Sequence, residues 1–317
     1  MKTILLTGGA GFIGSNLADK LLSEGYNVVV IDNFNNYYNP HLKEKNIAHN
    51  LAHQHYKLYR TDIEDISALK AVFDEHHFDA VIHLAARAGV RPSIEAPADY
   101  VKTNVLGTVN ILECMKDFNI KKLVVASSSS VYGNCKAAEF SEDLVVNAPI
   151  SPYAATKLAT EQICYTYHHL YDINVAALRF FTVYGPRQRP DLAIAKFTKM
   201  IAENKPIEMY GDGSSMRDYT FIDDIVSGIV AALQSNKIRY EIINLGGGEP
   251  ITLKTMISTI ESCMGKKATI ISKPMQAGDV EKTVCDYKKA NRLLGYVPKT
   301  TFKQGIEKYL KWVNIEQ

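Results

Sequence analysis

Cysteines are few in this sequence of 317 residues, and they form no recognisable framework. They are Cys114, Cys135, Cys164, Cys263 and Cys285, and no two of them have the spacing of a CxxC pair. An odd, scattered set argues against a disulfide scaffold and against a zinc site, and it is typical of reduced thiols. We therefore expect a cytoplasmic protein.

Long apolar runs and an excess of charge are also missing. No stretch approaches the roughly 18 apolar residues that a membrane-spanning helix needs. The N-terminal apolar run, residues 3–7, reaches glycines too soon for a signal peptide. The 36 lysines and arginines nearly balance the 34 aspartates and glutamates, for a formal net charge of +2. The composition gives no reason to expect a nucleic-acid or membrane partner.

Histidines gather in one stretch, residues 36–55, which carries His41, His49, His53 and His55. We interpret this stretch as a solvated helix or loop rather than a metal site, and we expect no metal.

Short β-branched runs alternate with helical patterns over residues 1–180. The expected strands are residues 3–7, 27–32, 56–60, 80–83, 122–126 and 174–179, and the expected helices include 14–23, 68–75, 100–118 and 152–170. Alternation with crossovers of this length predicts an α/β fold built on a Rossmann-type, doubly wound parallel sheet. Several expected strands are apolar throughout, with little alternation of polar residues. This supports a parallel sheet, because such a sheet is covered by helices on both faces.

The pattern changes after about residue 185, where shorter elements are interrupted by glycine clusters. We expect residues 1–181 to form a dinucleotide-binding domain. Residues 182–317 should mainly form a smaller, substrate-binding lobe against the carboxyl edge of the sheet, with residues 217–247 returning to the first domain.

Residues 7–14 read Thr-Gly-Gly-Ala-Gly-Phe-Ile-Gly, between the first expected strand and the first expected helix. Gly8 permits a tight turn, Gly11 lets the backbone approach a pyrophosphate, and Gly14 allows close packing of the helix on the strand. The helix N-terminus then offers free N–H groups to the phosphates. Asp32 ends the second expected strand, where a carboxylate accepts hydrogen bonds from the ribose and repels a 2′-phosphate. This arrangement predicts NAD rather than NADP; a purely structural glycine turn is the alternative.

The segment 151–157 reads Ser-Pro-Tyr-Ala-Ala-Thr-Lys. Ser151 before Pro152 predicts a helix start, and Tyr153 and Lys157 then share one face. A phenol has a pKa near 10, and lowering it by about 3 units takes about 4 kcal/mol. The Lys157 ammonium and the helix N-terminus both act in that direction. The same spacing occurs in purely structural helices, but its position after the fifth strand favours a general base.

Four serines, residues 127–130, follow the fifth expected strand. A hydroxyl here can hydrogen-bond the same substrate oxygen as Tyr153 and share its proton. A polar turn is the alternative interpretation.

These motifs occur together with His-Leu-Ala-Ala at 83–86 and Asn-Val-Leu-Gly-Thr at 104–108. Over nearly its whole length the chain resembles the extended short-chain dehydrogenase/reductase family, and within that family it is similar to the nucleotide-sugar epimerases.

The resemblance implies a catalytic triad of Ser128, Tyr153 and Lys157, with Asn104 supporting its hydrogen-bond network. Lys157 would also bind the nicotinamide ribose. Asp62, at the end of the third strand, would meet the adenine or would instead cap the following helix. The residues expected to contact NAD are Gly8, Gly11, Phe12, Ile13, Gly14, Asp32, Asn33, Asp62, Ile63, Leu84, Ala85, Ala86, Asn104, Tyr153 and Lys157.

The implied reaction is NAD-dependent 4-epimerisation of a UDP-sugar through a 4-keto intermediate. Relatives that continue to dehydration carry an Asp-Glu pair directly after the catalytic hydroxyl, and decarboxylases keep a glutamate. Here Ser129 and Ser130 stand in that place, so no carboxylate is there to serve an elimination. A dehydratase or decarboxylase is a weaker alternative, as is a non-catalytic NAD-sensing protein on the same fold.

Residues 86–91, 180–191 and 276–280 most resemble the UDP-glucuronate 4-epimerase subgroup. A hexuronate carboxylate needs hydroxyls and an arginine fork, and a charge-assisted hydrogen bond contributes about 1.5–3 kcal/mol. The candidates for the carboxylate are Ser129, Ser130, Thr182 and Arg189. The other implied substrate-binding residues are Arg87, Arg91, Arg217 for the diphosphate, and Asp279 for the uridine ribose.

Two positions depart from the family pattern. Arg87 replaces the glutamine usual in this subgroup, and Gln276 stands where the family often has an arginine. A 4-epimerase of neutral sugars, acting on UDP-glucose or UDP-N-acetylglucosamine, is therefore the main alternative.

Residues 100–118 and 152–170 have apolar stripes broad enough for a partner surface. By resemblance these two helices would pair with their copies in a four-helix homodimer interface. Ordinary packing within one chain explains the same stripes.

Overall fold

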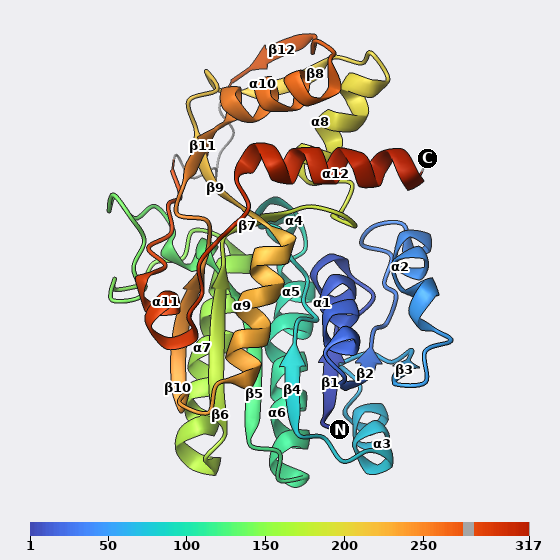
Figure 1. The fold of residues 1–317 in the computed structure, drawn as a ribbon. Helices are drawn as coiled ribbons and strands as arrows, with labels where there is room; N and C mark the ends of the chain where they lie inside the picture. Colours follow the sequence, from blue (N-terminus) through green and yellow to red (C-terminus); the bar gives the residue numbers. More distant parts are fainter. Residues whose placement is uncertain (275–281, 317) are drawn as a thin grey trace.

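In the computed structural model, which describes residues 1–274 and 282–316, a seven-stranded parallel sheet forms the centre of the chain (Figure 1). Its order is β10-β6-β5-β4-β1-β2-β3, so the direction of winding reverses between β1 and β4. All six predicted strands are present, and the prediction of a Rossmann-type doubly wound sheet is confirmed. The strands are β1 (Thr3–Thr7), β2 (Asn27–Ile31), β3 (Tyr56–Tyr59), β4 (Ala80–His83), β5 (Lys122–Ser128), β6 (Asn174–Phe180) and β10 (Tyr240–Leu245).

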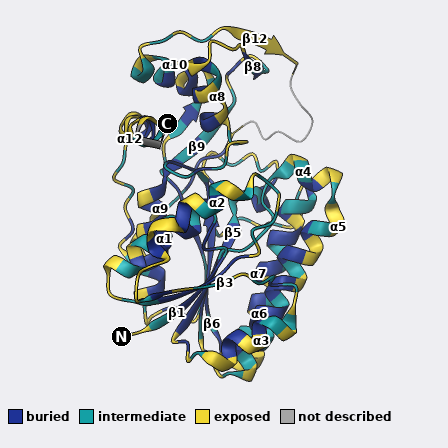
Figure 2. Cartoon of the chain, turned by 90° about the vertical axis from the view of Figure 1, so that its right-hand side faces the viewer, coloured by how far each residue is buried: buried dark blue, intermediate teal, exposed yellow. Residues whose placement is uncertain are grey.

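Helices cover both faces of this sheet, because successive side chains of each strand enter two separate apolar cores. Leu6 and Val30 belong to the core shared with α1 and α9, whereas Leu5 and Val29 belong to the core shared with α3, α6 and α7. Figure 2 shows the strands buried and the exposed residues on the outer sides of the helices. The covering helices are α1 (Phe12–Ser23), α9 (Ile222–Gln234), α3 (Ile66–Glu75), α6 (Gly107–Asp117) and α7 (Pro152–Tyr171).

Two small sheets lie beyond the carboxyl ends of the large sheet (Figure 1). One has the order β11-β9-β7, with β7 (Thr182–Tyr184), β9 (Met216–Phe221) and β11 (Pro250–Thr252); the other pairs β8 (Ile207–Tyr210) with β12 (Ile270–Lys273). The helices α8 (Ala193–Ala202), α10 (Leu253–Met264) and α12 (Phe302–Glu316) accompany them. Within 217–247, β9 belongs to a small sheet whereas β10 pairs with β6 in the large one. The functional division at residue 181 stays a prediction.

Most predicted bounds are within two residues of the observed ones, but two elements differ in ways that matter for the site. The fifth strand does not end at residue 126, because pairing with β6 continues to Ser128 opposite Phe180. Ser127 and Ser128 therefore lie in the strand, and the 3-10 turn η3 (Ser129–Tyr132) follows. The predicted helix 100–118 is divided among α5 (Pro97–Tyr100), the π-helical turn η2 (Val101–Leu106) and α6.

The remaining helical elements are α2 (Pro40–Ile47), the 3-10 turn η1 (Ala48–Asn50), α4 (Val90–Glu95) and α11 (Lys288–Leu294). Within residues 1–274 and 282–316, no helix is long and apolar enough to cross a membrane. The same residues contain no group of three histidine, cysteine, aspartate or glutamate side chains that could hold a metal ion. All five cysteines are free thiols.

Candidate active site

A cavity of about 290 Å³ lies at the carboxyl ends of the large sheet. It brings together the glycine-rich turn, the end of β2, the segment after β4, the end of β5, the start of α7 and the segment after β6. The predicted site residues that line it are Gly8, Gly11, Phe12, Ile13, Gly14, Asp32, Asn33, Ile63, Leu84, Ala85, Ala86, Arg87, Ser128, Tyr153, Lys157 and Arg189. One cavity thus collects the residues expected to bind NAD except Asp62 and Asn104, the three residues of the expected catalytic triad, and two of the expected substrate arginines.

The glycine-rich turn has no space for side chains. Gly8 has a φ of +70°, and a Cβ there would lie 2.8 Å from the backbone nitrogen of Ala85. A Cβ on Gly14 would lie 2.2 Å from the carbonyl oxygen of Gly8, so only glycine lets α1 start this close to β1. Gly11 is the N-cap of α1 and offers no capping side chain, which leaves the first N–H groups of the helix to a ligand. The turn therefore fits the pyrophosphate of a dinucleotide.

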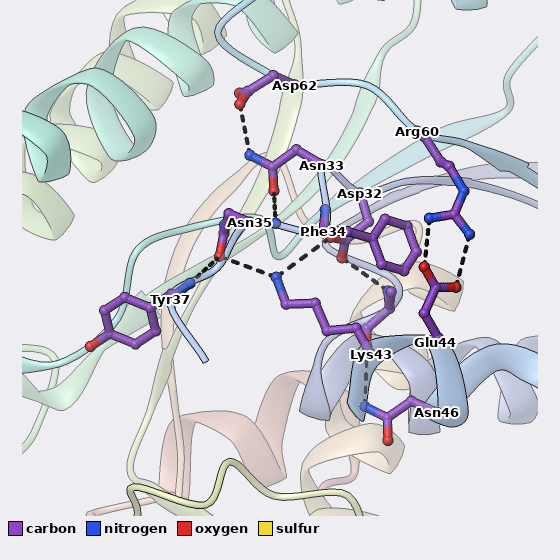
Figure 3. Close-up of polar contacts among 11 residues, drawn as sticks. Asp32, Asn33, Phe34, Asn35, Tyr37, Lys43, Glu44, Asn46, Arg60 and Asp62 are labelled. Atoms are coloured by element: carbon purple, nitrogen blue, oxygen red, sulfur yellow. Dashed lines mark hydrogen bonds and ion pairs between the residues drawn. The ribbon is translucent and has the colours of Figure 1, made fainter. Parts of the chain in front are cut away.

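The Asp32 carboxylate is buried and held in one orientation (Figure 3). Its Oδ2 accepts a hydrogen bond from the backbone N–H of Ala10 at 3.1 Å, and its Oδ1 accepts one from Phe34 at 2.9 Å. A fixed carboxylate at the end of β2 suits ribose hydroxyls and disfavours an added phosphate. These residues fit NAD as the dinucleotide.

Asp62 does not line the cavity and is bound to Asn33, the residue after Asp32. Its Oδ2 accepts a hydrogen bond from the Asn33 side chain at 2.7 Å (Figure 3). The N-cap of α3 is Asp65, which accepts from the backbone N–H groups of Ser67 and Ala68. The alternative in which Asp62 caps this helix is therefore wrong.

The segment after Asp32 contributes lining residues that sequence reasoning missed, among them Asn35, Tyr37, Tyr38 and Lys43. The Lys43 ammonium is buried, 3.2 Å from Asn35 Oδ1 and 3.8 Å from Asp32 Oδ1 (Figure 3), and burial lowers the pKa of Lys43. The expectation that residues 36–55 are a solvated helix or loop is wrong for this part, because the segment packs against the cavity. The aromatic and amide residues that directly follow Asp32 were the available signal.

The helix α7 carries two of the catalytic candidates. The Ser151 hydroxyl caps it by accepting from the backbone N–H of Ala154 at 3.1 Å, and Pro152 is its first residue, as predicted. Lys157 is 5% exposed and donates to the carbonyl oxygen of Ala126 at 2.7 Å. Burial lowers the pKa of Lys157 to about 8. The ammonium is therefore anchored to the end of β5 beside the cavity.

The pKa of Tyr153 moves opposite to the expected direction. Burial raises it, and the groups that oppose this rise are the Ser128 hydroxyl, by hydrogen bonding, and then the charge of Arg189. Lys157 does not contribute the expected lowering of this pKa, and its ammonium is bound to the carbonyl oxygen of Ala126.

The serine run divides into residues on and off the cavity wall. Ser127 and Ser128 line the cavity. Ser128 Oγ accepts hydrogen bonds from the Ser130 backbone N–H at 3.2 Å and the Ser130 hydroxyl at 2.9 Å. Ser129, Ser130 and Thr182 lie outside the set of lining residues. Their expected contact with a sugar carboxylate stays a prediction.

Asn104 also lies behind the wall rather than on it. Its Oδ1 accepts from the Arg87 backbone N–H at 2.8 Å, and its Nδ2 donates to the Arg87 carbonyl at 3.0 Å and to the Thr156 hydroxyl at 3.0 Å. The π-helical turn η2 thus connects the segment after β4 with α7.

The two arginines in the cavity are paired with carboxylates of their own chain. Arg189 binds Asp191 through Nε at 3.0 Å and Nη2 at 2.8 Å. Arg87 Nη1 lies 3.3 Å from an oxygen of Asp99.

The other expected sugar contacts lie elsewhere. Arg91 is not a lining residue, and its guanidinium lies 5.6 Å from the centre of the Tyr210 ring. Arg217 is also off the wall and donates to the carbonyl oxygen of Met216. Gln276 and Asp279 lie outside the described residues.

Known proteins resemble this chain in sequence and in structure. Residues 5–309 match the family model described as GDP-mannose 4,6 dehydratase. A UDP-glucuronate 4-epimerase of Thermodesulfobacterium geofontis is 46% identical over 313 residues, which cover 98% of this chain and 96% of the relative.

Two solved structures share the whole architecture. One is the UDP-glucuronic acid 4-epimerase of Bacillus cereus in complex with UDP-glucuronic acid and NAD, with a TM-score of 0.94, 39% identity, and coverage of 99% of this chain and 100% of the other. The other is the UDP-glucose 4-epimerase of Thermotoga maritima with UDP-glucose, with a TM-score of 0.91, 31% identity and 99% coverage of both chains. The relatives thus include epimerases of charged and of neutral sugars.

Proposed function

Since the chain belongs to the GDP-mannose 4,6 dehydratase family of extended short-chain dehydrogenases/reductases, we propose that it is an NAD-dependent UDP-glucuronate 4-epimerase. It interconverts UDP-glucuronate and UDP-galacturonate through a 4-keto intermediate. The observation that carries the proposal is one cavity lined by Ser128, Tyr153 and Lys157 together with Arg189, while serines rather than carboxylates follow Ser128.

The residues of the first 181 positions hold the cofactor. The turn at Gly8, Gly11 and Gly14 with the N-terminus of α1 takes the pyrophosphate, and Asp32 takes the adenosine ribose. NAD, when bound, supplies the hydride chemistry at carbon 4 of the sugar. Residues 182–317, apart from those that return to the large sheet, form the lobe that holds the UDP-sugar.

Tyr153 moves the proton in both halves of the reaction. As a phenolate it takes the proton from the 4-hydroxyl of the sugar, and as a phenol it returns a proton to the same oxygen of the 4-keto intermediate. The Ser128 hydroxyl donates a hydrogen bond to the 4-oxygen of the sugar in one step and to the Tyr153 phenolate in another. Burial raises the pKa of Tyr153, and the Ser128 hydroxyl and the charge of Arg189 oppose this rise. Lys157 holds the nicotinamide ribose.

The arginine fork of Arg189 recognises the hexuronate carboxylate. Asp191 binds this fork with two parallel hydrogen bonds, the geometry that a substrate carboxylate would adopt. A 4-keto uronate is a β-keto acid that loses carbon dioxide easily, so this fork must also hold the carboxylate in an orientation that disfavours the loss.

Proton NMR tests the proposal directly. The purified chain is offered UDP-glucuronate, UDP-glucose and UDP-N-acetylglucosamine separately, with NAD present. We expect conversion of UDP-glucuronate to its 4-epimer, no carbon dioxide or water released, and no solvent deuterium at carbon 4. Turnover confined to the neutral sugars would contradict the uronate assignment, and deuterium at carbon 5 would indicate a dehydratase.

We further propose that the chain works in the cytoplasm as a homodimer. Val101 and Leu106 on η2 and Tyr165 on α7 are about half exposed, and α6 and α7 pack side by side, so these helices offer an apolar surface to a second copy. The five free thiols suit a reducing compartment. Sedimentation velocity distinguishes the dimer from a monomer.

A further inference from the structure

We propose that Glu161 and Arg179 are positioning residues that act on the catalytic end of the cavity through Ser127. They set the register of α7 against β5, so that Tyr153 and Lys157 on the helix face Ser128 on the strand. This inference deepens the proposed function and rests on it.

A buried ion pair joins the two elements. Glu161 Oε1 accepts hydrogen bonds from the Ser127 hydroxyl and from Arg179 Nε at 2.8 Å, and Glu161 Oε2 accepts from Arg179 Nη2 at 2.8 Å. The side chains of Glu161 and Arg179 are 0% and 2% exposed. Ser127 and Arg179 are register partners on the adjacent strands β5 and β6, so the glutamate of α7 binds both strands at one level.

A second contact lies one helical turn earlier. Lys157 donates to the carbonyl oxygen of Ala126, and Glu161, four residues on, accepts from the hydroxyl of Ser127. Two successive turns of α7 are thus bound to two successive residues of β5. A shift of the helix along the strand would break both contacts, and it would move Tyr153 away from Ser128, the next residue of the strand.

The same arginine supports the turn on the other side of Ser128. The Arg179 guanidinium lies 4.8 Å from the centre of the Tyr132 ring, at the end of η3. The Tyr132 hydroxyl donates to Asn244 Oδ1 at 2.7 Å, and Asn244 lies on β10. Ser128 is therefore held between a residue bonded to Glu161 and a turn that packs on Arg179.

Stability alone does not explain the pair. Among the residues that the structure describes, Arg179 Nη1 is buried with no hydrogen-bond partner. The core around it is apolar, with Val125 on β5, Ala177 on β6 and Cys164 on α7. Replacing a buried ion pair by apolar side chains of similar size is often neutral or stabilising. Misplacing a catalytic group by about 1 Å, in contrast, can cost about a hundredfold in rate. The pair is therefore best explained by the placement of the catalytic groups.

The decisive variant replaces the pair with apolar residues, Glu161→Leu with Arg179→Met. We expect its melting temperature to equal or exceed that of the wild type, and kcat to fall at least about tenfold. The KM for the UDP-sugar and the amount of NAD bound should stay within about twofold, because the binding residues are unchanged. A well-folded double variant with near-normal kcat overturns the proposal.

Ser127 provides a second test that does not depend on folding of the double variant. Ser127→Ala removes the hydroxyl and should lower kcat about tenfold, whereas Ser127→Thr keeps it and should restore most of the rate. Equal activity of the two variants overturns the proposal.

The matched control is Asp172→Asn, which breaks an exposed pair with Arg239 next to the far end of α7 and should leave kcat unchanged. Activity is measured with whichever UDP-sugar the wild-type chain converts, so a wild type active only on neutral sugars contradicts the uronate assignment and not this inference. A wild type that converts none contradicts both.

Discussion

The two ends of the cavity hold their polar groups in different ways. At the catalytic end the Lys157 ammonium is 5% exposed and bound to a backbone carbonyl at the end of β5. At the sugar end the arginines are paired with carboxylates that are half exposed, Arg189 with Asp191 (49%) and Arg87 with Asp99 (47%). Regular secondary structure fixes the first set, whereas ion pairs formed by residues of loops and short helices hold the second.

Under the proposed function, this difference means that one end of the cavity carries out the proton transfer and the other end selects the sugar. Groups fixed by a strand and a helix keep their geometry whichever sugar enters. Asp191 is half exposed whereas Arg189 is largely buried, so under the proposed function a substrate carboxylate replaces Asp191 on the Arg189 fork and Asp191 turns to solvent. The contrast predicts large effects on turnover at the catalytic end and selective effects on one substrate at the sugar end.

The largest effect should come from Tyr153→Phe. The phenyl ring keeps its packing against Tyr100, whose ring centre lies 6.2 Å away, while the variant loses the only proposed proton acceptor. We expect bound NAD to be unchanged and kcat to fall at least about a hundredfold for every UDP-sugar converted. NAD content after denaturation and NMR turnover check the two parts. Near-normal turnover would mean that the base lies elsewhere.

Arg189→Gln should have a smaller and selective effect. A charge-assisted hydrogen bond contributes about 1.5–3 kcal/mol, so kcat/KM for UDP-glucuronate should fall about 10- to 100-fold. Any conversion of UDP-glucose should change by less than about threefold, because that sugar has no carboxylate. Equal losses of kcat/KM on both substrates would show that Arg189 maintains the shape of the cavity and does not recognise the sugar carboxylate. The contrast between the two ends would then fail.

The sequence predicted best those site residues that lie at the end of a strand or the start of a helix. Gly8 and Asp32 lie where a strand meets a turn, and Tyr153 and Lys157 lie in the first two turns of a capped helix. Local rules of strand, turn and cap geometry suffice to bring these residues to the carboxyl edge of the sheet.

The features that the sequence did not predict depend on contacts between residues far apart in the chain. Serine has a low preference for strands, and only pairing with β6 shows that β5 continues through Ser127 and Ser128. The pair between Glu161 and Arg179 joins a helix and a strand that no local pattern connects. Lys43 reaches the cavity because α2 folds back over the end of β2, which spacing along the chain does not show.

The family resemblance named four candidate arginines for the substrate but did not indicate which of them lie at the cavity. It named Arg91 and Arg217 together with Arg87 and Arg189, yet only the last two line the cavity. Arg217 lies on β9 in the second lobe, so its position depends on how that lobe packs against the sheet, which sequence motifs do not specify.

Arg87→Gln should produce the smallest effect, although it changes a charged residue of the cavity. Asn104 makes two hydrogen bonds to the backbone of Arg87, so the backbone after β4 should keep its conformation when the side chain of residue 87 is changed. The side chain itself contributes a partly exposed pair with Asp99, for which about 0–1 kcal/mol is expected. We expect kcat/KM for UDP-glucuronate to change by less than about fivefold, measured beside Arg189→Gln under the same conditions. A loss as large as that of Arg189→Gln would mean that two arginines share the sugar carboxylate, and that the glutamine of related uronate epimerases is replaced here by a second cation for the same anion.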